Sequence, residues 1–448
     1  MTDQQRISSN RAFIMAIAGA AIGLGNIWRF PYVVGENGGS LFFLGYLFFV
    51  VVMGLPVMVA EIALGRAGRA APADSFRQLA VANGRSRHWS KIAGIGTVAS
   101  VLILSFYSVV AGWVLFYFGH SLTMDASMAS MEGAQQQLND FLSSPWQVIA
   151  GHTLFVVMTM AVSARQVSSG IERLNNQLMP LMYVILVVLV VYTAGFPGFS
   201  DALHYLFGAN GESINWTLIT EAMGHAFFTL AVGACCLMAY GAYMPENQSI
   251  LKAVGMVAFM DVLVAVMVGL ASFSVVFSEG MMPDSGPGLM FVALPVALHH
   301  LPMGIWILPL FFLLLVFAAW TSSINIAEPL VALLSRLFQS RIKGALLTGI
   351  VVWGLGLIPA LSFNVFGGVT LPSGRSLFDA YTALPTTFLL PVTGFFILIF
   401  SGYVVSKQCF FTELRTSILM GKIIWGLVRY ISPVLVFIIL VSGIFFGR

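Results

Sequence analysis

Residues 19–32 of the chain read GAAIGLGNIWRFPY, an apolar stretch that glycine, asparagine and arginine interrupt. Gly23, Gly25 and Asn26 occupy its middle, and Arg29 follows about one turn later. A continuous transmembrane helix pairs its own backbone groups, but hydrocarbon offers no partner to freed backbone, an amide or a guanidinium. We therefore predict a helix that is broken inside a membrane and that surrounds polar ligands.

The composition is that of a membrane protein. Of the 448 residues, 58% are hydrophobic and 9% are charged, whereas soluble domains carry about 25% charged residues. The net charge of +3 is distributed in a way that reflects membrane topology, so we expect the lipid bilayer as a partner and no nucleic acid. Cys235, Cys236 and Cys409 lie in apolar stretches and predict neither a disulfide nor a zinc site.

The apolar stretches predict eleven transmembrane helices, most of them near or above the ~20 residues that a crossing needs. No linker longer than a loop separates them, so we expect a single transmembrane domain over residues 1–448. The predicted spans are 12–34, 40–65, 92–121, 146–164, 174–195, 217–242, 250–277, 304–335, 343–362, 377–404 and 423–446.

The positive charges of the loops predict the orientation. With a cytoplasmic N-terminus, all of the 21 Lys and Arg residues except Arg29, Arg375 and Arg448 fall in cytoplasmic segments. Such a bias sets the orientation of membrane proteins. We expect a multi-pass protein of the cell (plasma) membrane whose C-terminus lies in the extracellular or periplasmic space.

A second interrupted span carries Thr229, Ala231, Gly233 and Ala234 at mid-depth. Corresponding breaks in two halves of a chain indicate an inverted-repeat transporter, with substrate and ion sites near the midplane. The expected units are repeat one at about 12–195, repeat two at about 217–404 and an extra helix at about 423–446.

The broken stretch belongs to a set of motifs at 23–32 (GLGNIWRFPY), 36–39 (ENGG), 55–66 (LPVMVAEIALGR), 170–173 (GIER) and Pro180. Together they resemble the neurotransmitter:sodium symporter family, the sodium-coupled amino-acid transporters typified by LeuT. The resemblance extends across spans one to ten. It implies an all-α polytopic membrane protein with the LeuT fold, a 5+5 inverted repeat in which helices 1 and 6 are broken.

The resemblance also implies two Na+ ions held by oxygen atoms, which hard cations prefer. The hydroxyls of the second set could instead bond back to their own helix, as membrane helices tolerate. By resemblance, the first sodium site takes Ala21, Asn26, Thr229 and Asp261, and the second takes Gly19, Ile22, Ala318, Thr321 and Ser322.

Asp261 is costly in a bilayer and needs a partner. Chloride-coupled members resemble one another in having asparagine at this place and serine one turn later, where this chain has Asp261 and Ala265. We hypothesise that the carboxylate supplies the negative charge that chloride would bring, so that no chloride is needed. The alternative is an aspartate that caps an internal hydrogen-bond network.

The substrate that the resemblance implies is a small zwitterionic amino acid. Ala20 and Ala234 stand where LeuT has asparagine and phenylalanine, and no expected pocket residue is charged apart from Asp261 of the sodium site. A wide apolar pocket favours a neutral L-amino acid with a bulky hydrophobic or aromatic side chain. The side chains of Ile103 and Ile326 would leave less room for the very largest substrate side chains. The expected pocket residues are Ala20, Ala21, Leu24, Gly25, Ile103, Tyr107, Phe228, Thr229, Ala231, Ala234, Ser322 and Ile326.

The outer gate departs from the family pattern. Arg29, Tyr107 and Phe228 resemble the extracellular gate, whose arginine normally pairs with an aspartate at the position of Thr382. Asp379 lies three residues earlier and on nearly the same helix face. We expect water to join it to Arg29, or Asp379 to cap its own helix.

Further residues are expected to support the transport machinery. By resemblance Glu61 lies buried near the broken sixth span, where it would be protonated or donate to freed carbonyls as a brace. Gly170 and Pro180 lower helical stability at the start of span five, and unwinding there would admit water to the second sodium site. His225 stands where LeuT has glutamine.

Other functional classes fit less well. A channel needs a continuous polar path, and a triad of Ser322, His225 and Asp261 has no hydrolase elbow around it, so we do not expect an enzyme. The remaining alternatives are a sodium-coupled transporter of another small zwitterion and a non-transporting amino-acid sensor of the same fold.

Overall fold

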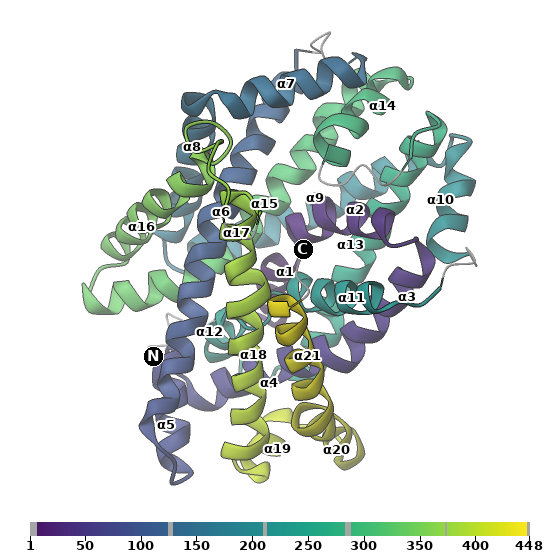
Figure 1. The fold of residues 1–448 in the computed structure, drawn as a ribbon. Coiled ribbons are helices and arrows are strands. Elements are labelled where there is room, and N and C mark those ends of the chain that lie inside the picture. The colour runs from purple at the N-terminus through teal and green to yellow at the C-terminus, as the bar shows by residue number, and fades with distance from the viewer. Residues whose placement is uncertain (1–6, 124–128, 209–212, 283–287, 372–373, 446–448) are drawn as a thin grey trace.

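A computed structural model shows an all-α protein (Figure 1). Within the part of the chain that it describes, the only β pairing is an isolated bridge between Thr370 and Ser376. In the same part, nine helices are long and apolar enough to cross a membrane, and one bent pair of helices could form a tenth span. The described residues are 7–123, 129–208, 213–282, 288–371 and 374–445.

The first span is broken slightly ahead of the predicted place. Helix α1 (Asn10–Ala21) ends at Ile22, whose ψ of 109° is extended. The chain resumes as a π-helical turn, η2 (Gly25–Arg29), which continues into α2 (Phe30–Glu36), and the two halves are bent by 51°. Asn26, which the sequence analysis places in the break, belongs to this π turn.

The second broken span consists of α11 (Trp216–Thr229) and α12 (Cys236–Tyr243). Between them the chain leaves the helix, and Ala231, Gly233 and Cys235 have φ angles of 52°, 83° and 58°. Residues with a side chain rarely adopt such angles, so surrounding contacts must hold this backbone. The sixth predicted span therefore consists of two short helices.

The other spans form in the predicted places, with ends that differ by a few residues. Several contain a π-helical turn, and such turns are frequent at functional sites. In chain order these spans are α3 (Ser40–Phe49), η3 (Val50–Gly54) and α4 (Leu55–Gly68); α6 (Lys91–Ser121); α8 (Pro145–Ser163); η6 (Ser168–Glu172) and α9 (Arg173–Thr193); α13 (Ile250–Ser278); α15 (Gly304–Leu337); α16 (Arg341–Leu361); α17 (Leu377–Ala383), η8 (Leu384–Leu389), α18 (Leu390–Ile399) and η9 (Phe400–Val404); and α20 (Ile418–Gly426), η10 (Leu427–Ile431) and α21 (Ser432–Phe445).

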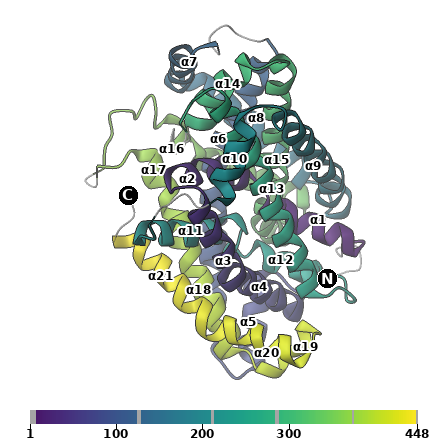
Figure 2. The ribbon, with the colours of Figure 1, turned by 90° about the vertical axis from the view of Figure 1, so that its right-hand side faces the viewer.

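Short helices outside the predicted spans cover the two ends of the molecule. Helices α5 and α19 lie at one end, and α7 and α14 lie at the other (Figures 1 and 2). Their apolar runs are too short to span a bilayer, so the search for long apolar stretches does not detect them. They are α5 (Pro72–Ala82), η4 (Arg87–Ser90), α7 (Met131–Ser143), α10 (Gly198–Phe207), η7 (Leu289–Ala293), α14 (Leu294–His300) and α19 (Lys407–Leu414).

The broken first span lies inside the bundle. Helix α1 packs against α13, α15 and α9, and α11 packs against α3 and η2. The backbone groups that the two breaks release are thereby enclosed by protein, as a membrane environment requires.

Candidate functional site

A buried polar cluster lies where the first broken span meets α13. The Asp261 carboxylate accepts hydrogen bonds from Asn26 Nδ2 at 2.8 Å, from Thr229 Oγ1 at 3.0 Å and from the Tyr46 hydroxyl at 2.9 Å. Asn26, Tyr46 and Asp261 have 0% exposed surface. A buried carboxylate is unfavourable unless it is paired or hydrogen-bonded, and these donors supply the bonds. The structure thus brings together three of the residues predicted for the first sodium ion.

Tyr46 is the member of this cluster that the sequence analysis misses. It lies on α3, where it is the only hydroxyl-bearing aromatic residue in the run SLFFLGYLFF. Ala21, the fourth predicted member, ends α1 and lines the neighbouring cavity together with Thr229. Ala265 is buried one turn after Asp261 and offers no hydroxyl.

The residues predicted for the second sodium ion meet where α1 packs against α15. Ser322 Oγ donates across this contact to the Ala20 carbonyl at 3.3 Å. Thr321 Oγ1 donates back within α15 to the Ala318 carbonyl at 3.2 Å, which is the alternative that the sequence left open. Such a bond uses the hydroxyl proton and leaves the oxygen lone pairs for a cation.

The α1 side of this contact is tightly packed. A Cβ added at Gly19 would lie 2.7 Å from Oδ1 of Asn175 and 2.9 Å from Nδ2 of Asn325. Ile22 follows as the extended residue of the break, and its N–H donates to the Ala18 carbonyl at 2.7 Å. The polar ends of two asparagines thus surround the backbone of α1.

All predicted pocket residues except Leu24 line one cavity of about 40 Å³. Leu24 lies instead in a larger neighbouring cavity. None of the described residues that line the small cavity, hereafter the pocket, is charged. Its lining consists of Ala20, Ala21, Gly23, Gly25, Ile103, Tyr107, Phe228, Thr229, Ala231, Ala234, Ser322, Ile326 and Leu390.

Tyr107 connects the pocket to the break in the first span. Its hydroxyl oxygen accepts a hydrogen bond from the Leu24 N–H at 3.1 Å. The same oxygen lies 2.7 Å from the point that a Cβ at Gly23 would occupy, and Ser322 Oγ lies 2.9 Å from that point. The absence of a side chain at Gly23 therefore allows the hydroxyls of Tyr107 and Ser322 to approach the backbone closely.

The larger cavity, hereafter the vestibule, has a volume of about 360 Å³. It shares Gly25, Tyr107 and Phe228 with the pocket. These residues form the partition between the two spaces. Arg29 and Asp379, both predicted as gate residues, line the vestibule.

Arg29 is held on the α11 side of the vestibule. Its Cζ lies 5.3 Å from the centre of the Phe228 ring, and its Nη2 lies 3.7 Å from the Glu221 carboxylate. The carboxylate that contacts Arg29 thus comes from the sixth span, and the sequence analysis did not assign it. Glu221 precedes Phe228 by seven residues, so the two share a helix face, and this spacing is the signal that could have found it.

Asp379 takes part in the cap of its own helix. Ser376 is the N-cap of α17, where its Oγ accepts from the Asp379 N–H at 3.1 Å and donates to the Asp379 carboxylate at 2.6 Å. Thr382 Oγ1 donates back to the Asp379 carbonyl at 3.1 Å. Ser376 and not Asp379 is therefore the N-cap of α17, so the prediction that Asp379 caps the helix is wrong, and the water-mediated link to Arg29 stays a prediction.

His225 lies away from the vestibule. Its side chain is fully buried, and its ring packs against Tyr46 at 5.2 Å and Phe30 at 5.6 Å between ring centres. Neither ring nitrogen has a hydrogen-bond partner among the described residues. His225 therefore packs beside the Asp261 cluster and does not line the outer gate.

A sequence profile described as the sodium:neurotransmitter symporter family matches residues 4–140 and 127–446. The chain belongs to this family. Its activity is accordingly that of a transporter and not of an enzyme, and it is a multi-pass membrane protein.

Individual relatives agree with the family assignment. The uncharacterized sodium-dependent transporter YhdH of Bacillus subtilis is 32% identical over 451 residues, which cover 99% of this chain and 98% of the relative. Human sodium- and chloride-dependent GABA transporter 2 is 25% identical, over 93% of this chain and 75% of the relative. The crystal structure of MhsT in complex with L-phenylalanine superimposes with a TM-score of 0.89 at 35% identity, covering 98% of this chain and 99% of MhsT. This member of the symporter family therefore has the LeuT fold.

In this symporter, Glu61 braces the second break. Its Oε1 accepts a hydrogen bond from the Gly233 N–H at 2.5 Å, and its side chain has no exposed surface. The sequence analysis expected Glu61 to be protonated or to donate to freed carbonyls; in the structure its Oε1 accepts from a freed amide. On another side of the break, Ser100 Oγ donates to the Ala234 carbonyl at 2.9 Å.

The start of the fifth span is irregular at one of the two predicted residues. Gly170 lies in the π turn η6, where an added Cβ would come within 2.7 Å of the Val162 carbonyl. Pro180 lies inside α9 without ending it. Helix α1 packs against both η6 and α9, and Glu172 of η6 accepts a hydrogen bond from the Ser8 N–H at 3.2 Å, just before α1 begins.

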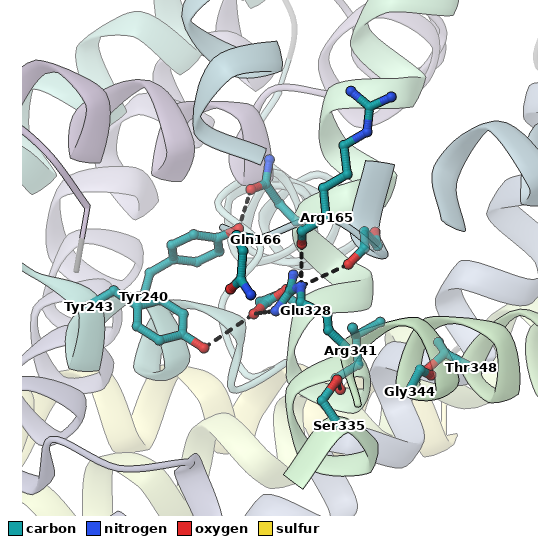
Figure 3. A network of polar contacts seen from close by, with 12 residues as sticks. Arg165, Gln166, Tyr240, Tyr243, Glu328, Ser335, Arg341, Gly344 and Thr348 are labelled. Carbon is teal, nitrogen blue, oxygen red and sulfur yellow. Dashed lines mark hydrogen bonds and ion pairs between the residues drawn. The ribbon is translucent and has the colours of Figure 1, made fainter. Parts of the chain in front are cut away.

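A buried polar network lies along α15 beyond the second sodium set, and Figure 3 shows the part of it around Glu328 and Arg341. Asn325 Nδ2 donates to the Thr321 carbonyl at 2.6 Å, and Asn325 Oδ1 accepts from the Tyr240 hydroxyl. Further along α15, Glu328 forms an ion pair with Arg341 at 2.6 Å. The network therefore joins α12, α15 and α16. The sequence analysis overlooks it, although a carboxylate in the apolar run AAWTSSINIAEP was a visible signal.

Proposed function

We propose that the protein is a sodium-coupled symporter that carries a neutral L-amino acid, with a bulky hydrophobic or aromatic side chain, into the cell by alternating access. The observation that carries the proposal is the uncharged pocket between Tyr107 and Ala234, beside the buried oxygen cluster of Asp261. The substrate class is supported by the similar structure of MhsT, which contains L-phenylalanine. The two repeats, about 12–195 and about 217–404, would move relative to each other around this pocket.

The first sodium ion is assigned to the Asp261 cluster. Thr229 Oγ1 lies 3.0 Å from the carboxylate and Asn26 Nδ2 lies 2.8 Å from it. A bound cation would take the place of these donors, with the carboxylate, the Thr229 hydroxyl and the Asn26 amide oxygen as ligands, and this oxygen accepts from the Gly23 N–H at 3.3 Å in the structure. The ion would also neutralise a carboxylate that lies buried at membrane depth. The four ligand residues in this proposal are Ala21, Asn26, Thr229 and Asp261.

The second sodium ion is assigned to the contact between α1 and α15. Its ligands would be carbonyl and hydroxyl oxygens, which are uncharged, so the site suits a monovalent cation. The proximity of Ser322 Oγ to the Ala20 carbonyl, 3.3 Å across the contact, supports the assignment. The five ligand residues in this proposal are Gly19, Ile22, Ala318, Thr321 and Ser322.

The amino-acid carboxylate is assigned to the start of η2. Amides at the N-terminal end of a helix attract anions, and Leu24 and Gly25 stand there. Because the Tyr107 oxygen accepts from the Leu24 N–H, the Tyr107 hydroxyl proton is available to a substrate carboxylate. The side chain would then extend toward Ala234 and Ile326, where no described lining residue could pair with a charge.

The pocket volume bears on how a bulky substrate enters. About 40 Å³ is too little for an aromatic side chain, since small-molecule pockets usually measure about 300–1,000 Å³. Phe228 and Tyr107 form the partition to the vestibule of about 360 Å³. Entry therefore requires the Phe228 ring to swing away, which would merge the two spaces.

Chloride independence follows from the Asp261 cluster in this proposal. In this proposal the Asp261 carboxylate supplies the negative charge beside the first sodium site, and Ala265 offers no hydroxyl to an anion.

We propose a cytoplasmic N-terminus and an outer C-terminus. Residues 66–91 and 405–422, which carry α5 and α19 at one end of the molecule (Figure 1), contain nine of the 21 Lys and Arg residues, and such an excess marks the cytoplasmic side. The vestibule, with Arg29, Tyr107, Phe228 and Asp379 as gate residues, would then open to the outside.

Uptake by proteoliposomes tests the proposal. Each standard amino acid is offered under an inward sodium gradient, with potassium replacing sodium as the control. We expect accumulation of aromatic or large aliphatic amino acids only with sodium. A non-transporting sensor would bind them without flux, and a transporter of another zwitterion would accumulate none of them; either result would refute the proposal.

A further inference from the structure

Two cations stack on one tryptophan at the end of the molecule that carries α19 and α20 (Figure 1). Nζ of Lys407 lies 4.7 Å from the centre of the Trp425 ring, and Cζ of Arg429 lies 4.7 Å from the same centre. Such contacts are favourable for each cation. We call Lys407, Trp425 and Arg429 the cation cluster.

Arg429 is fixed in this cluster by its neighbours. Its Cζ lies 4.5 Å from the ring centre of Tyr403 and 5.5 Å from that of Tyr430. The Tyr403 hydroxyl donates to the Arg429 carbonyl at 2.9 Å. An added Cβ at Gly402 would lie 3.1 Å from Arg429 Cα, so backbone packing also sets its position. The guanidinium is therefore positioned in advance of any ligand.

The positive charge of the cluster is not compensated by the described part of the chain. No described carboxylate lies within 4.0 Å of Lys407 or Arg429 in any ion pair of the structure. Glu413, on the same helix as Lys407, pairs with Arg66 at 2.6 Å instead. Two like charges that contact one ring repel each other, and an anion bound beside them would offset that repulsion.

Two N–H donors of the cluster also lack acceptors. Nε of Arg429 and Nε1 of Trp425 are buried and have no hydrogen-bond partner among the described residues. A buried donor without a partner is destabilising. Two cations and two open donors in one place require an anion with several acceptor oxygens, and a phosphate group has this chemistry.

The surface beside the cluster is apolar and exposed. Along the C-terminal helix, Ile431, Val434 and Phe437 are 45%, 57% and 50% exposed. Aromatic and basic residues beside such a surface are typical of the boundary between hydrocarbon and head groups. A phospholipid whose phosphate binds the cations would pack its acyl chains against this surface. Inorganic phosphate would leave the same surface uncovered.

We propose that the cation cluster binds the phosphate of an anionic phospholipid, with the acyl chains along η10 and α21. Under the orientation proposed above, this lipid belongs to the cytoplasmic leaflet, where basic pockets of membrane proteins bind anionic head groups. The lipid would hold the C-terminal helix to α19 and η9. This site is separate from the pocket and does not depend on transport.

Native mass spectrometry of the purified full-length protein tests the proposal. Phosphatidylglycerol and phosphatidylcholine of identical acyl chains are titrated separately, and inorganic phosphate is a third arm. The variants are Lys407→Gln, in which an exposed side chain is changed, and Arg429→Gln. The matched control is Lys422→Gln, because Lys422 is an exposed lysine of α20 outside the cluster.

We expect tighter binding of phosphatidylglycerol than of phosphatidylcholine, and about fivefold weaker phosphatidylglycerol binding in Lys407→Gln, the loss expected for one cation at an anionic surface. Arg429→Gln should lose more of its affinity for phosphatidylglycerol, and Lys422→Gln should bind this lipid as tightly as the unmutated protein. Equal affinity for the two lipids, an unchanged affinity in Lys407→Gln, or displacement of the lipid by inorganic phosphate would overturn the proposal.

Discussion

The Asp261 carboxylate accepts a 2.8 Å hydrogen bond from Asn26 Nδ2, which joins the seventh span to the π turn of the broken first span. Any movement that separates η2 from α13 must break this bond. A cation bound at the carboxylate would therefore stabilise the arrangement in which these two elements lie together, which is how an ion can be coupled to a conformation.

Replacing Asp261 by asparagine removes the charge and keeps the shape. We expect the sodium concentration that gives half-maximal uptake to rise by about tenfold or more, a free-energy change of ~1.4 kcal/mol. Sodium titrations of uptake measure it. Ala265→Ser, one turn away on α13, is the control and should leave the sodium dependence unchanged. An unaltered sodium requirement in Asp261→Asn would contradict the assignment of the first ion.

Gly23→Ala tests the close approach at the first break. The new Cβ would lie 2.7 Å from the Tyr107 hydroxyl and 2.9 Å from Ser322 Oγ. Overpacking of this kind costs about 1–3 kcal/mol, so we expect a lower melting temperature and a loss of uptake. In the control, Gly94→Ala, the added methyl meets nothing within 4 Å. If both variants transport equally well, the crowding argument is wrong.

Glu61→Ala tests the brace at the second break. The substitution leaves the buried Gly233 N–H without an acceptor, which costs about 1–3 kcal/mol. We expect a clear fall in thermal stability, measured by intrinsic fluorescence. Glu61→Gln keeps a carbonyl oxygen at the same distance and should recover most of the loss. Equal stability of the two variants would show that the hydrogen bond to Gly233 does not matter.

Glu221→Gln tests the strength of the ion pair in the vestibule. The side chains of Arg29 and Glu221 are 26% and 45% exposed, and exposed pairs contribute about 0.2–1 kcal/mol. We expect a change in uptake of less than about fivefold. Arg29→Gln should have a larger effect, because it also removes the contact with the Phe228 ring. A loss in Glu221→Gln as large as in Arg29→Gln would mean that the ion pair itself closes the gate.

The sequence predicts the fold and most of the pocket because the responsible signals are local. Polar residues in the middle of an apolar span identify both breaks, and the long apolar runs give the spans. The position of the first break differs because a π turn takes up Asn26, and π turns have no clear sequence signature. The short end helices are overlooked since their apolar runs cannot cross a bilayer.

The contacts that the sequence analysis did not predict join residues that lie far apart in the chain. Tyr46 and His225 pack together beside Asp261, and nothing in their own segments indicates that contact. Glu221 becomes the partner of Arg29 only because α11 packs against η2. Leu24 lies in the vestibule and not in the pocket because the break precedes it. Such contacts depend on how the spans pack, which spacing along one span does not reveal.

The measurement that tests the central claim most directly is the anion dependence of sodium-driven uptake. Proteoliposomes with the unmutated protein take up L-phenylalanine from sodium chloride or from sodium gluconate. With Asp261 supplying the negative charge, the two initial rates should agree, and both should vanish when potassium replaces sodium. A large loss of rate in gluconate, or uptake that persists without sodium, would contradict the account.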